Sequence, residues 1–450
     1  MTTKRQVLQF QPVNLGANGV FSVSRNGLQQ VVFQVSALPR VMLGKTLRVN
    51  GKMKVLSTSG AFPTNATSYL VDQPSDDAFS IDGRIGVSSC IDTLSVSNLK
   101  GSVYANVKNY NRLMSSLVPL NQSFNNYING SDEEFGCGKQ ITQAKRCDKE
   151  FSFSIPLLDG FIQQNIDMKL VDGLIITITL APDSFVIHNN YWYNQNAQVP
   201  IGAYYEWSDL VLSFDTEVPD QAGVEALMSN RTGMMSYKTY SSFYNVIISN
   251  QQNYTALPNT RQTTACIGNF VPSEWLNNYQ YNSSMTPQLL YRKANLVLNN
   301  NIRMNSFTYD RSSVRLPYDF EIKSEGTQNK GTADSIKNYT ELNAIRDDWE
   351  IYNFLKSLET ELSNPLSDTQ RNKFDRDRYA INFVDKENCY SIGVSYDKFS
   401  NGINFKDQVF SLRIQSVLPA DQQFPATSMF LFFEHENQVL FKDGMITIMS

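Results

Sequence analysis

The chain has few residues of the types that carry out catalysis near neutral pH. Its 450 residues include two histidines, His188 and His435. Neither histidine stands in a spacing that would join it to a nucleophile or a metal ion. We interpret both as loop or strand residues without a catalytic task, and we predict no catalytic triad.

A glycine-containing segment, GCGK at 136–139, has the composition of part of a phosphate-binding loop. Such a loop requires a further glycine where this chain has Glu133, and a Ser or Thr for magnesium where it has Gln140. We therefore predict no nucleotide site.

Paired acidic residues occur in RDD at 346–348 and in RNKFDRDRY at 371–379. Two carboxylates are what a glycosidase needs, but clusters of mixed charge are typical of a solvated face. We assign these acids no catalytic role.

The cysteines are odd in number and scattered along the chain: Cys90, Cys137, Cys147, Cys266 and Cys389. The spacing from Cys137 to Cys147 matches no compact metal pattern. We interpret the cysteines as reduced thiols, most of them buried, and we predict neither a metal nor a cofactor.

Composition and charge point to a β-rich protein. Aromatic residues make up 12% of the chain and charged residues 18%, where about 25% is usual. The formal net charge of -4 gives no basic surplus for binding phosphates directly. The N-terminal segment MTTKRQVLQFQ has no apolar run of signal-peptide length, and no stretch of about 18 apolar residues predicts a membrane span. We expect the chain to be made and used in cytosol-like conditions.

Alternating apolar residues predict short strands before residue 219. The clearest runs are Val20–Ser24, Val31–Val35, Ile91–Val96, Phe151–Ile155, Leu174–Leu180 and Leu210–Phe214. Asn26-Gly27 and Asn50-Gly51 are typical turn dipeptides, so each predicts a strand–turn–strand unit.

Two segments have helical spacing instead. Val103, Val107, Tyr110, Met114 and Leu117 recur every three or four residues and predict a helix that Pro119 ends. Leu342–Leu362 repeats this pattern over about six turns before Pro365, after a polar segment, 323–338, that predicts an exposed loop.

Residues 187–207 have no usable period but are rich in aromatic side chains in a polar setting. We predict a long ordered loop whose aromatic residues contribute to a subunit interface, since exposed Trp and Tyr clusters mark protein contacts; folding back over its own domain is the alternative. The candidate interface residues are Tyr191, Trp192, Tyr193, Tyr204 and Tyr205.

The segment WSDLVLSFDTEVPD at 207–220 predicts a strand that ends in the middle of the chain, because Glu217–Asp220 contains a proline and two acids. A short helix is expected over 222–235. Further strands are expected at Tyr244–Ser249, Thr264–Val271, Ala294–Leu298, Ile392–Val394 and Phe410–Ile414, and Lys442-Asp443-Gly444 predicts the turn of a last hairpin. We predict an all-β fold of two tandem eight-stranded sandwiches with inserted helices, spanning residues 1–220 and 221–450.

Five segments in order resemble the double jelly-roll major capsid proteins, and most closely those of virophages and polinton-like viruses. They are GSVYANVKNYNRLMSSL at 101–117, FSFSIPLLDGFIQQN at 151–165, IITITLAPDSFVI at 175–187, WSDLVLSFDTEVP at 207–219 and YSIGVSYDKFSNGINFKDQVFSLRIQSVL at 390–418. The resemblance implies two jelly rolls standing side by side in each chain. Three chains would then form a pseudo-hexagonal capsomer.

The family further implies a structural protein of the virion that is not an enzyme. Its partners would be itself, as a homotrimer and as neighbouring capsomers, together with penton and minor capsid proteins. It would not bind nucleic acid sequence-specifically. Two other hypotheses remain: a viral attachment or carbohydrate-binding β-sandwich, and a glycoside-acting enzyme on the same scaffold.

Overall fold

The computed structural model describes most of the strand-forming parts of the chain. The described residues are 4–15, 18–27, 29–57, 79–82, 85–121, 145–146, 150–189, 202–279, 283–284, 289–291, 302–315, 322–323, 391–396, 402–417, 426–442 and 444–449. The predictions for 294–298, 342–362, 136–139, 346–348 and 371–379 lie outside these residues, as do Cys137, Cys147 and Cys389.

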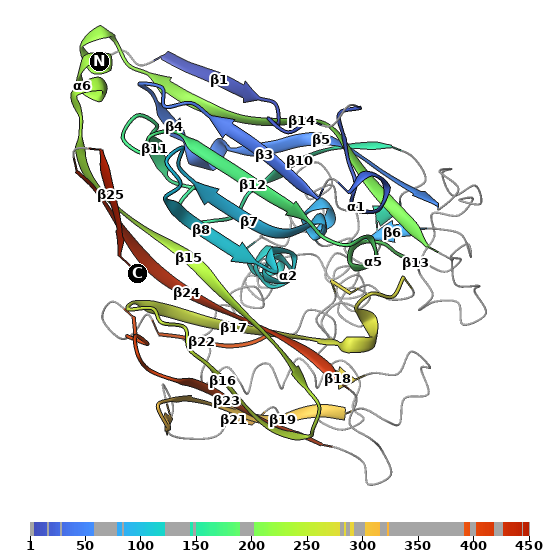
Figure 1. The fold of residues 1–450 in the computed structure, drawn as a ribbon. Helices are drawn as coiled ribbons and strands as arrows, with labels where there is room; N and C mark the ends of the chain where they lie inside the picture. Colours follow the sequence, from blue (N-terminus) through green and yellow to red (C-terminus); the bar gives the residue numbers. More distant parts are fainter. Residues whose placement is uncertain are drawn as a thin grey trace, which may run out of the picture.

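The described part of the first half forms three sheets (Figure 1). Its strands are β1 Lys4–Phe10, β2 Val20–Phe21, β3 Gln30–Val35, β4 Val41–Leu43, β5 Arg48–Ser57, β6 Phe79–Ile81, β7 Ile91–Ser97, β8 Val103–Lys108, β9 Lys145–Arg146, β10 Phe151–Pro156, β11 Asn165–Asp167, β12 Leu174–Leu180, β13 His188–Asn189 and β14 Ala203–Val218. Its helices are α1 Val23–Asn26, α2 Tyr110–Asn121 and α5 Asp183–Val186.

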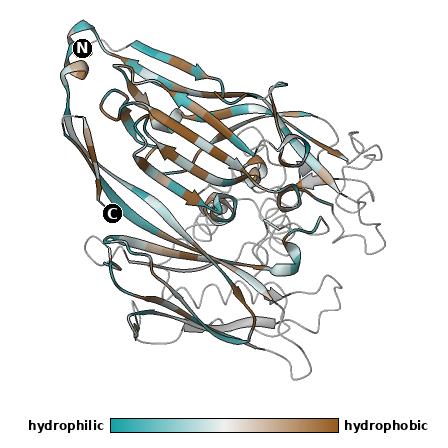
Figure 2. Cartoon of the chain, in the orientation of Figure 1, coloured by the Kyte–Doolittle hydropathy of each residue, from teal (hydrophilic) through white to brown (hydrophobic). Residues whose placement is uncertain are grey.

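Two of these sheets form the walls of the first sandwich. One has the order β10-β5-β14-β4-β11 with β1 and β2 also on β14, and the other has the order β3-β12-β7-β8. Strand β12 shows why they pack: Leu174, Ile176, Ile178 and Leu180 alternate inward and are buried. The bands of opposite hydropathy along the strands in Figure 2 follow this alternation.

The described part of the second half forms two sheets. Its strands are β15 Thr232–Ile247, β16 Gln251–Ala256, β17 Thr263–Pro272, β18 Leu289–Tyr291, β19 Ile302–Arg311, β20 Val314–Arg315, β21 Ile322–Lys323, β22 Ser391–Ser395, β23 Phe410–Val417, β24 Thr427–Lys442 and β25 Met445–Met449, after helix α6 Gln221–Ser229. One sheet has the order β15-β24-β17-β22 with β25 on β24, and the other has the order β16-β23-β19-β18 with β20 and β21 on β19.

Strand β24 lies in the middle of the molecule and is buried from Thr427 to His435. Phe433 meets the ring of Phe410 on β23 edge-on, with the centroids 4.7 Å apart. Phe430 lies under the guanidinium of Arg112, which belongs to α2 of the first half. We call the sheet β15-β24-β17-β22 the central sheet. It is therefore covered by the other sheet of its own half and by the first half.

Every hydrogen-bonded strand pair among the described residues joins strands of the same half. Strand β14 ends at Val218, and α6 begins after Asp220, whose side chain accepts a hydrogen bond from the backbone N–H of Gly223. Such a cap satisfies a donor that the first helical turn leaves free. The short helix predicted over 222–235 is present only as Gln221–Ser229, because strand β15 already begins at Thr232. The division between residues 220 and 221 stays a prediction.

Several predicted strands are confirmed. Ile91–Val96, Phe151–Ile155 and Leu174–Leu180 coincide with β7, β10 and β12. The last hairpin is also confirmed, because Lys442 on β24 pairs with Met445 on β25.

Both predicted turns in the first 60 residues were wrong. Asn26-Gly27 ends the short helix α1, with Gly27 at φ 67°, and the strands on either side pair with β14 and β12 rather than with each other. Asn50-Gly51 lies inside the continuous strand β5. A Cβ at Gly51 would lie 2.5 Å from Leu210 Cδ2 and 3.1 Å from the carbonyl oxygen of Ser208, so the glycine favours close packing of the strands rather than a turn.

The helix predicted from Val103 was wrong in its first half. Residues Val103–Lys108 form strand β8, which pairs with β7 at the end of the sheet, and the chain turns at Asn109, which has φ 53°. Asparagine tolerates this left-handed conformation better than most residues. Helix α2 then starts at Tyr110 and continues to Asn121 rather than ending at Pro119.

Candidate functional site

Both histidines are buried. Burial lowers the pKa of His188 to about 4, against the opposing charge of Asp82. Burial also lowers the pKa of His435, whose Nδ1 lies 3.2 Å from the carbonyl oxygen of Phe433 and must therefore donate to it. In the part of the chain that the structure describes, no group of three or more His, Cys, Asp or Glu side chains could hold a metal ion.

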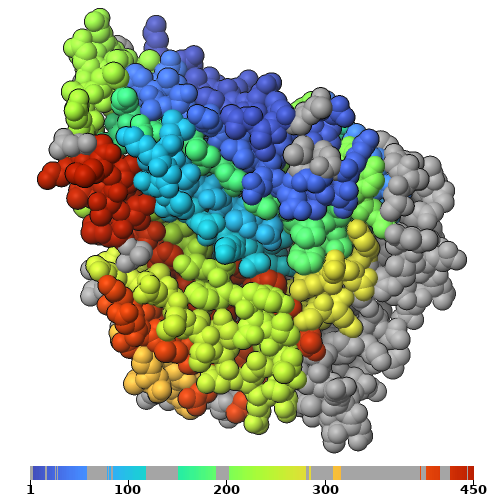
Figure 3. Space-filling view, in the orientation of Figure 1, coloured from blue at the N-terminus to red at the C-terminus, as the bar shows by residue number. Residues whose placement is uncertain are grey.

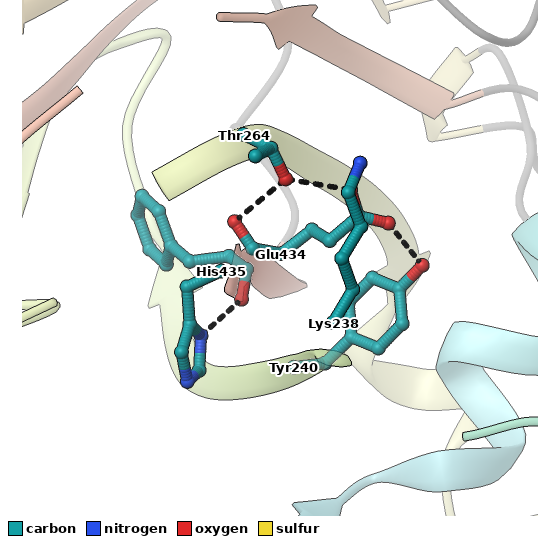
Figure 4. Close-up of polar contacts among 6 residues, drawn as sticks. Lys238, Tyr240, Thr264, Glu434 and His435 are labelled. Atoms are coloured by element: carbon teal, nitrogen blue, oxygen red, sulfur yellow. Dashed lines mark hydrogen bonds and ion pairs between the residues drawn. The ribbon is translucent and has the colours of Figure 1, made fainter. Parts of the chain in front are cut away.

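The polar cluster around Glu434 joins three strands of the central sheet (Figure 4). Glu434 on β24 accepts hydrogen bonds from Lys238 Nζ at 2.8 Å and Tyr240 OH at 2.8 Å, both on β15, and from Thr264 Oγ1 on β17 at 2.6 Å. Burial opposes ionisation, but these donors outweigh it and lower the pKa of Glu434. The carboxylate favours its ionised form and accepts three side-chain hydrogen bonds from the two neighbouring strands.

A second buried carboxylate, Glu206 on β14, has a similar environment in the first half. It forms ion pairs with Arg25 of α1 and with Lys54 Nζ of β5, the latter at 2.9 Å. Burial opposes ionisation, but these two cations lower the pKa of Glu206. Since a glycosidase needs one protonated carboxylic acid, neither Glu206 nor Glu434 fits that role.

The described residues bring the two halves together along a contact zone that we call the seam. Thr239 on β15 donates to the buried carboxylate of Asp159, which precedes a turn of the first half, at 2.9 Å. Tyr237 on β15 donates to the carbonyl oxygen of Tyr104 on β8 at 2.7 Å. A Cβ at Gly160 would lie 2.1 Å from the carbonyl oxygen of Lys238, so only glycine permits this approach.

Arg112 of α2 anchors the other part of the seam. Its guanidinium lies 5.8 Å from the ring centroid of Phe185 and 5.4 Å from that of Phe430, and its Nη2 donates to Ser283 at 3.1 Å. Its carbonyl oxygen accepts a hydrogen bond from Asn269 on β17 at 2.8 Å. A buried cation held between aromatic rings of both halves fixes α2 against the central sheet.

The five predicted interface residues do not all belong to one loop, because two of them lie in a strand. Tyr191, Trp192 and Tyr193 lie outside the described residues. Tyr204 and Tyr205 belong to strand β14, where Tyr204 is half-buried. Tyr205 is fully buried and donates to the carbonyl oxygen of Ala181 at 2.6 Å, so its side chain belongs to the core of its own sandwich and not to the surface.

The sequence reasoning missed the residues that join the halves. No local sequence pattern identifies Asp159, Thr239 and Arg112 as contact residues, because their partners lie at distant positions in the sequence. Glu434 and Glu206 do have such a pattern: each acid directly follows a run of aromatic or apolar residues, in FLFFEH and AYYEWS. A charge in such a setting requires a cationic partner when it is buried.

No protein-family model and no curated protein sequence matches the chain. Solved structures do resemble it over its full length. The capsid of PBCV-1 virus aligns with a TM-score of 0.59 at 11% identity, covering 100% of this chain and 97% of that one. The mavirus major capsid protein aligns at 0.52 and 10% identity, covering 98% and 89%. The Sputnik virophage structure aligns at 0.51 and 9% identity, covering 99% and 88%.

This chain has the double jelly-roll fold. The predicted all-β class and tandem arrangement are thereby confirmed, and the likeness was readable in the order of five short segments. In this double jelly-roll protein the two sandwiches lie side by side and are joined by the hydrogen bonds of the seam (Figure 1).

Proposed function

We propose that the double jelly-roll protein is the major capsid protein of an icosahedral DNA virus and resides in the virion. The observation that carries this proposal is the likeness to the PBCV-1 capsid and the mavirus major capsid protein, which covers 98% or more of this chain in both cases. A likeness that includes both jelly rolls and their side-by-side placement favours a shared architectural task over a shared single-domain module.

The seam supports this role physically. A shell subunit must transmit contacts from one neighbour to the next without bending in the middle. Buried hydrogen bonds from Thr239 and Tyr237, together with Arg112 between two rings, resist relative movement of the sandwiches. Three such rigid pairs around a three-fold axis approximate six-fold symmetry, so we infer a homotrimeric, pseudo-hexagonal capsomer.

The three-fold contact would be heterologous, with one jelly roll of a chain meeting the other jelly roll of the next. Tyr191, Trp192, Tyr193 and the half-buried Tyr204 stay our candidates for it. Further partners are neighbouring capsomers, penton and minor capsid proteins. The net charge of -4 favours a shell held by protein contacts without sequence-specific binding of nucleic acid. Among the described helices, none is long and apolar enough to span a bilayer.

Native mass measurement of the purified chain tests this proposal. We expect about three times 51 kDa at micromolar concentration and pseudo-hexagonal particles in electron micrographs. A permanent interface on the order of 2,000 Å² or more should keep the trimer intact on dilution. A stable monomer that binds glycans would contradict the capsid role and favour the attachment protein instead.

A further inference from the structure

The last strand, β25, lies at the rim of the molecule (Figure 3). It pairs through Met445–Met449 with Gln438–Lys442 of β24. Among the described strands, none pairs with its other edge. Met445 is 67% exposed and Met449 is 40% exposed, as expected for an edge that faces solvent.

The register of the hairpin decides which backbone groups face outward. Lys442 and Met445 flank a two-residue loop, so they form a hydrogen-bonded pair, and Leu440 with Thr447 forms the next one. Hydrogen-bonded and non-hydrogen-bonded pairs alternate along an antiparallel ladder. The N–H and C=O groups of Ile446 and Ile448 therefore point away from β24, toward the open edge.

This edge lacks the features that normally prevent strand pairing. Natural edge strands carry charged residues, prolines or bulges that block association. The exposed strand β1 follows this rule, because KRQVLQF contains Lys4 and Arg5. Strand β25 reads MITIM, with no charge, no proline and an uninterrupted register.

The five residues of β25 also form a palindrome centred on Thr447. In an antiparallel pair of two such strands about a two-fold axis, Thr447 faces its own copy, Ile446 faces Ile448, and Met445 faces Met449. This alignment places the outward backbone groups of Ile446 and Ile448 opposite each other, as a hydrogen-bonded pair requires. We propose that β25 is a self-association edge that pairs antiparallel with β25 of a second copy of this chain.

Pairing would also cover exposed apolar side chains. Met445, Thr447 and Met449 share a face with Leu440 of β24 and with Met234 of β15, its register partner. Leu440 is 41% exposed and Met234 is 67% exposed. A second copy would continue this face across the axis, while Ile446 and Ile448 stay packed against the core. An apolar face that continues across a symmetry axis is typical of a protein contact.

The contact is isologous, since the same residues come from both copies. It is separate from the heterologous three-fold contact of the proposed capsomer and does not depend on it. If both contacts form, two-fold pairs would link one capsomer to the next.

A cysteine at the axis tests the pairing in the full-length chain. Thr447→Cys places two thiols in a non-hydrogen-bonded pair, where the Cα atoms lie about 4.5 Å apart, within the range that a disulfide spans. We expect mild oxidation to give a covalent dimer as the main product. Met445→Cys is the matched control: alone it faces Met449 and should not exceed the wild-type background, but mixed with Met449→Cys it should crosslink.

Charge exchange provides a second test. Thr447→Lys and Thr447→Glu should each lose self-association through like charges at the axis, and a mixture of the two should regain it. Absence of the Thr447→Cys dimer in protein with a wild-type melting curve would overturn the proposal. Equal crosslinking by Met445→Cys alone, or a mixture of charge variants that stays dissociated, would also overturn it.

Discussion

The hydroxyl of Thr239 donates to the carboxylate of Asp159 at 2.9 Å, and this hydrogen bond joins two jelly rolls that share no hydrogen-bonded sheet among the described residues. Asp159 also accepts from the backbone N–H of Phe161 at 3.0 Å. The carboxylate is buried at the seam, so its protonation state affects hydrogen bonds with both halves.

Removing the Thr239 hydroxyl should destabilise the chain. We expect Thr239→Val to lower the free energy of unfolding by about 1–3 kcal/mol, because a buried carboxylate loses a donor that water cannot replace. Thr255→Val on the exposed side of β16 is the matched control and should change it by less than about 0.5 kcal/mol. Denaturant unfolding measures both, and equal effects would show that the seam hydrogen bond adds no stability.

The pH dependence of stability should report the raised pKa of Asp159. Burial raises its pKa from 3.8 to about 6 in the folded chain. Between these values the folded state binds more protons than the unfolded state, so the contribution of Asp159 to stability falls as pH rises from about 4 to 6. The total effect is on the order of 3 kcal/mol at 1.36 kcal/mol per pKa unit.

Asp159→Asn should remove this dependence. We expect the difference in unfolding free energy between the variant and the wild type to grow in the variant's favour from pH 4 to pH 6. Denaturant titrations at four pH values measure it. A difference that stays constant across this range would show that Asp159 titrates near its ordinary pKa.

Glu434→Gln should destabilise the central sheet at neutral pH. The folded pKa of Glu434 is lowered, so its stabilisation is present above the unfolded value of 4.5 and is lost as pH falls through the lower folded pKa. We expect a loss of about 1–3 kcal/mol at pH 7 and a smaller loss in acid. Glu436→Gln, two residues along β24 and less buried, is the control, and an equal loss from it would argue against the cluster.

Gly160→Ala should separate the halves locally. Its Cβ would lie 2.1 Å from the carbonyl oxygen of Lys238, a backbone atom that cannot rotate away. We expect a loss of about 1–3 kcal/mol from overpacking. Gly19→Ala has open space around its Cβ but φ 63°, so it reports the backbone strain alone, about 1 kcal/mol. Thermal melting that ranks Gly19→Ala as the more damaging change would contradict a tight seam.

Strand periodicity was readable from the sequence because it is local. Leu174, Ile176, Ile178 and Leu180 recur at every second position, and a sandwich wall requires this pattern wherever one face is buried. The proline and acids at Glu217–Asp220 likewise predicted where β14 ends. The order of such segments carried the resemblance to capsid proteins, and the fold agrees with it.

Tertiary contacts decided the structure of segments whose local pattern predicted the wrong element or predicted none. Asn50-Gly51 has the composition of a turn, but β5 continues through it as a strand paired with β10 and β14, and Leu210 of β14 lies against the glycine. Val103–Lys108 has helical spacing, but the free edge of β7 offers it a ladder of backbone hydrogen bonds. Asp159 and Thr239 are 80 residues apart. Their hydrogen bond depends on how two finished sandwiches meet, and no local preference of either segment contains that information.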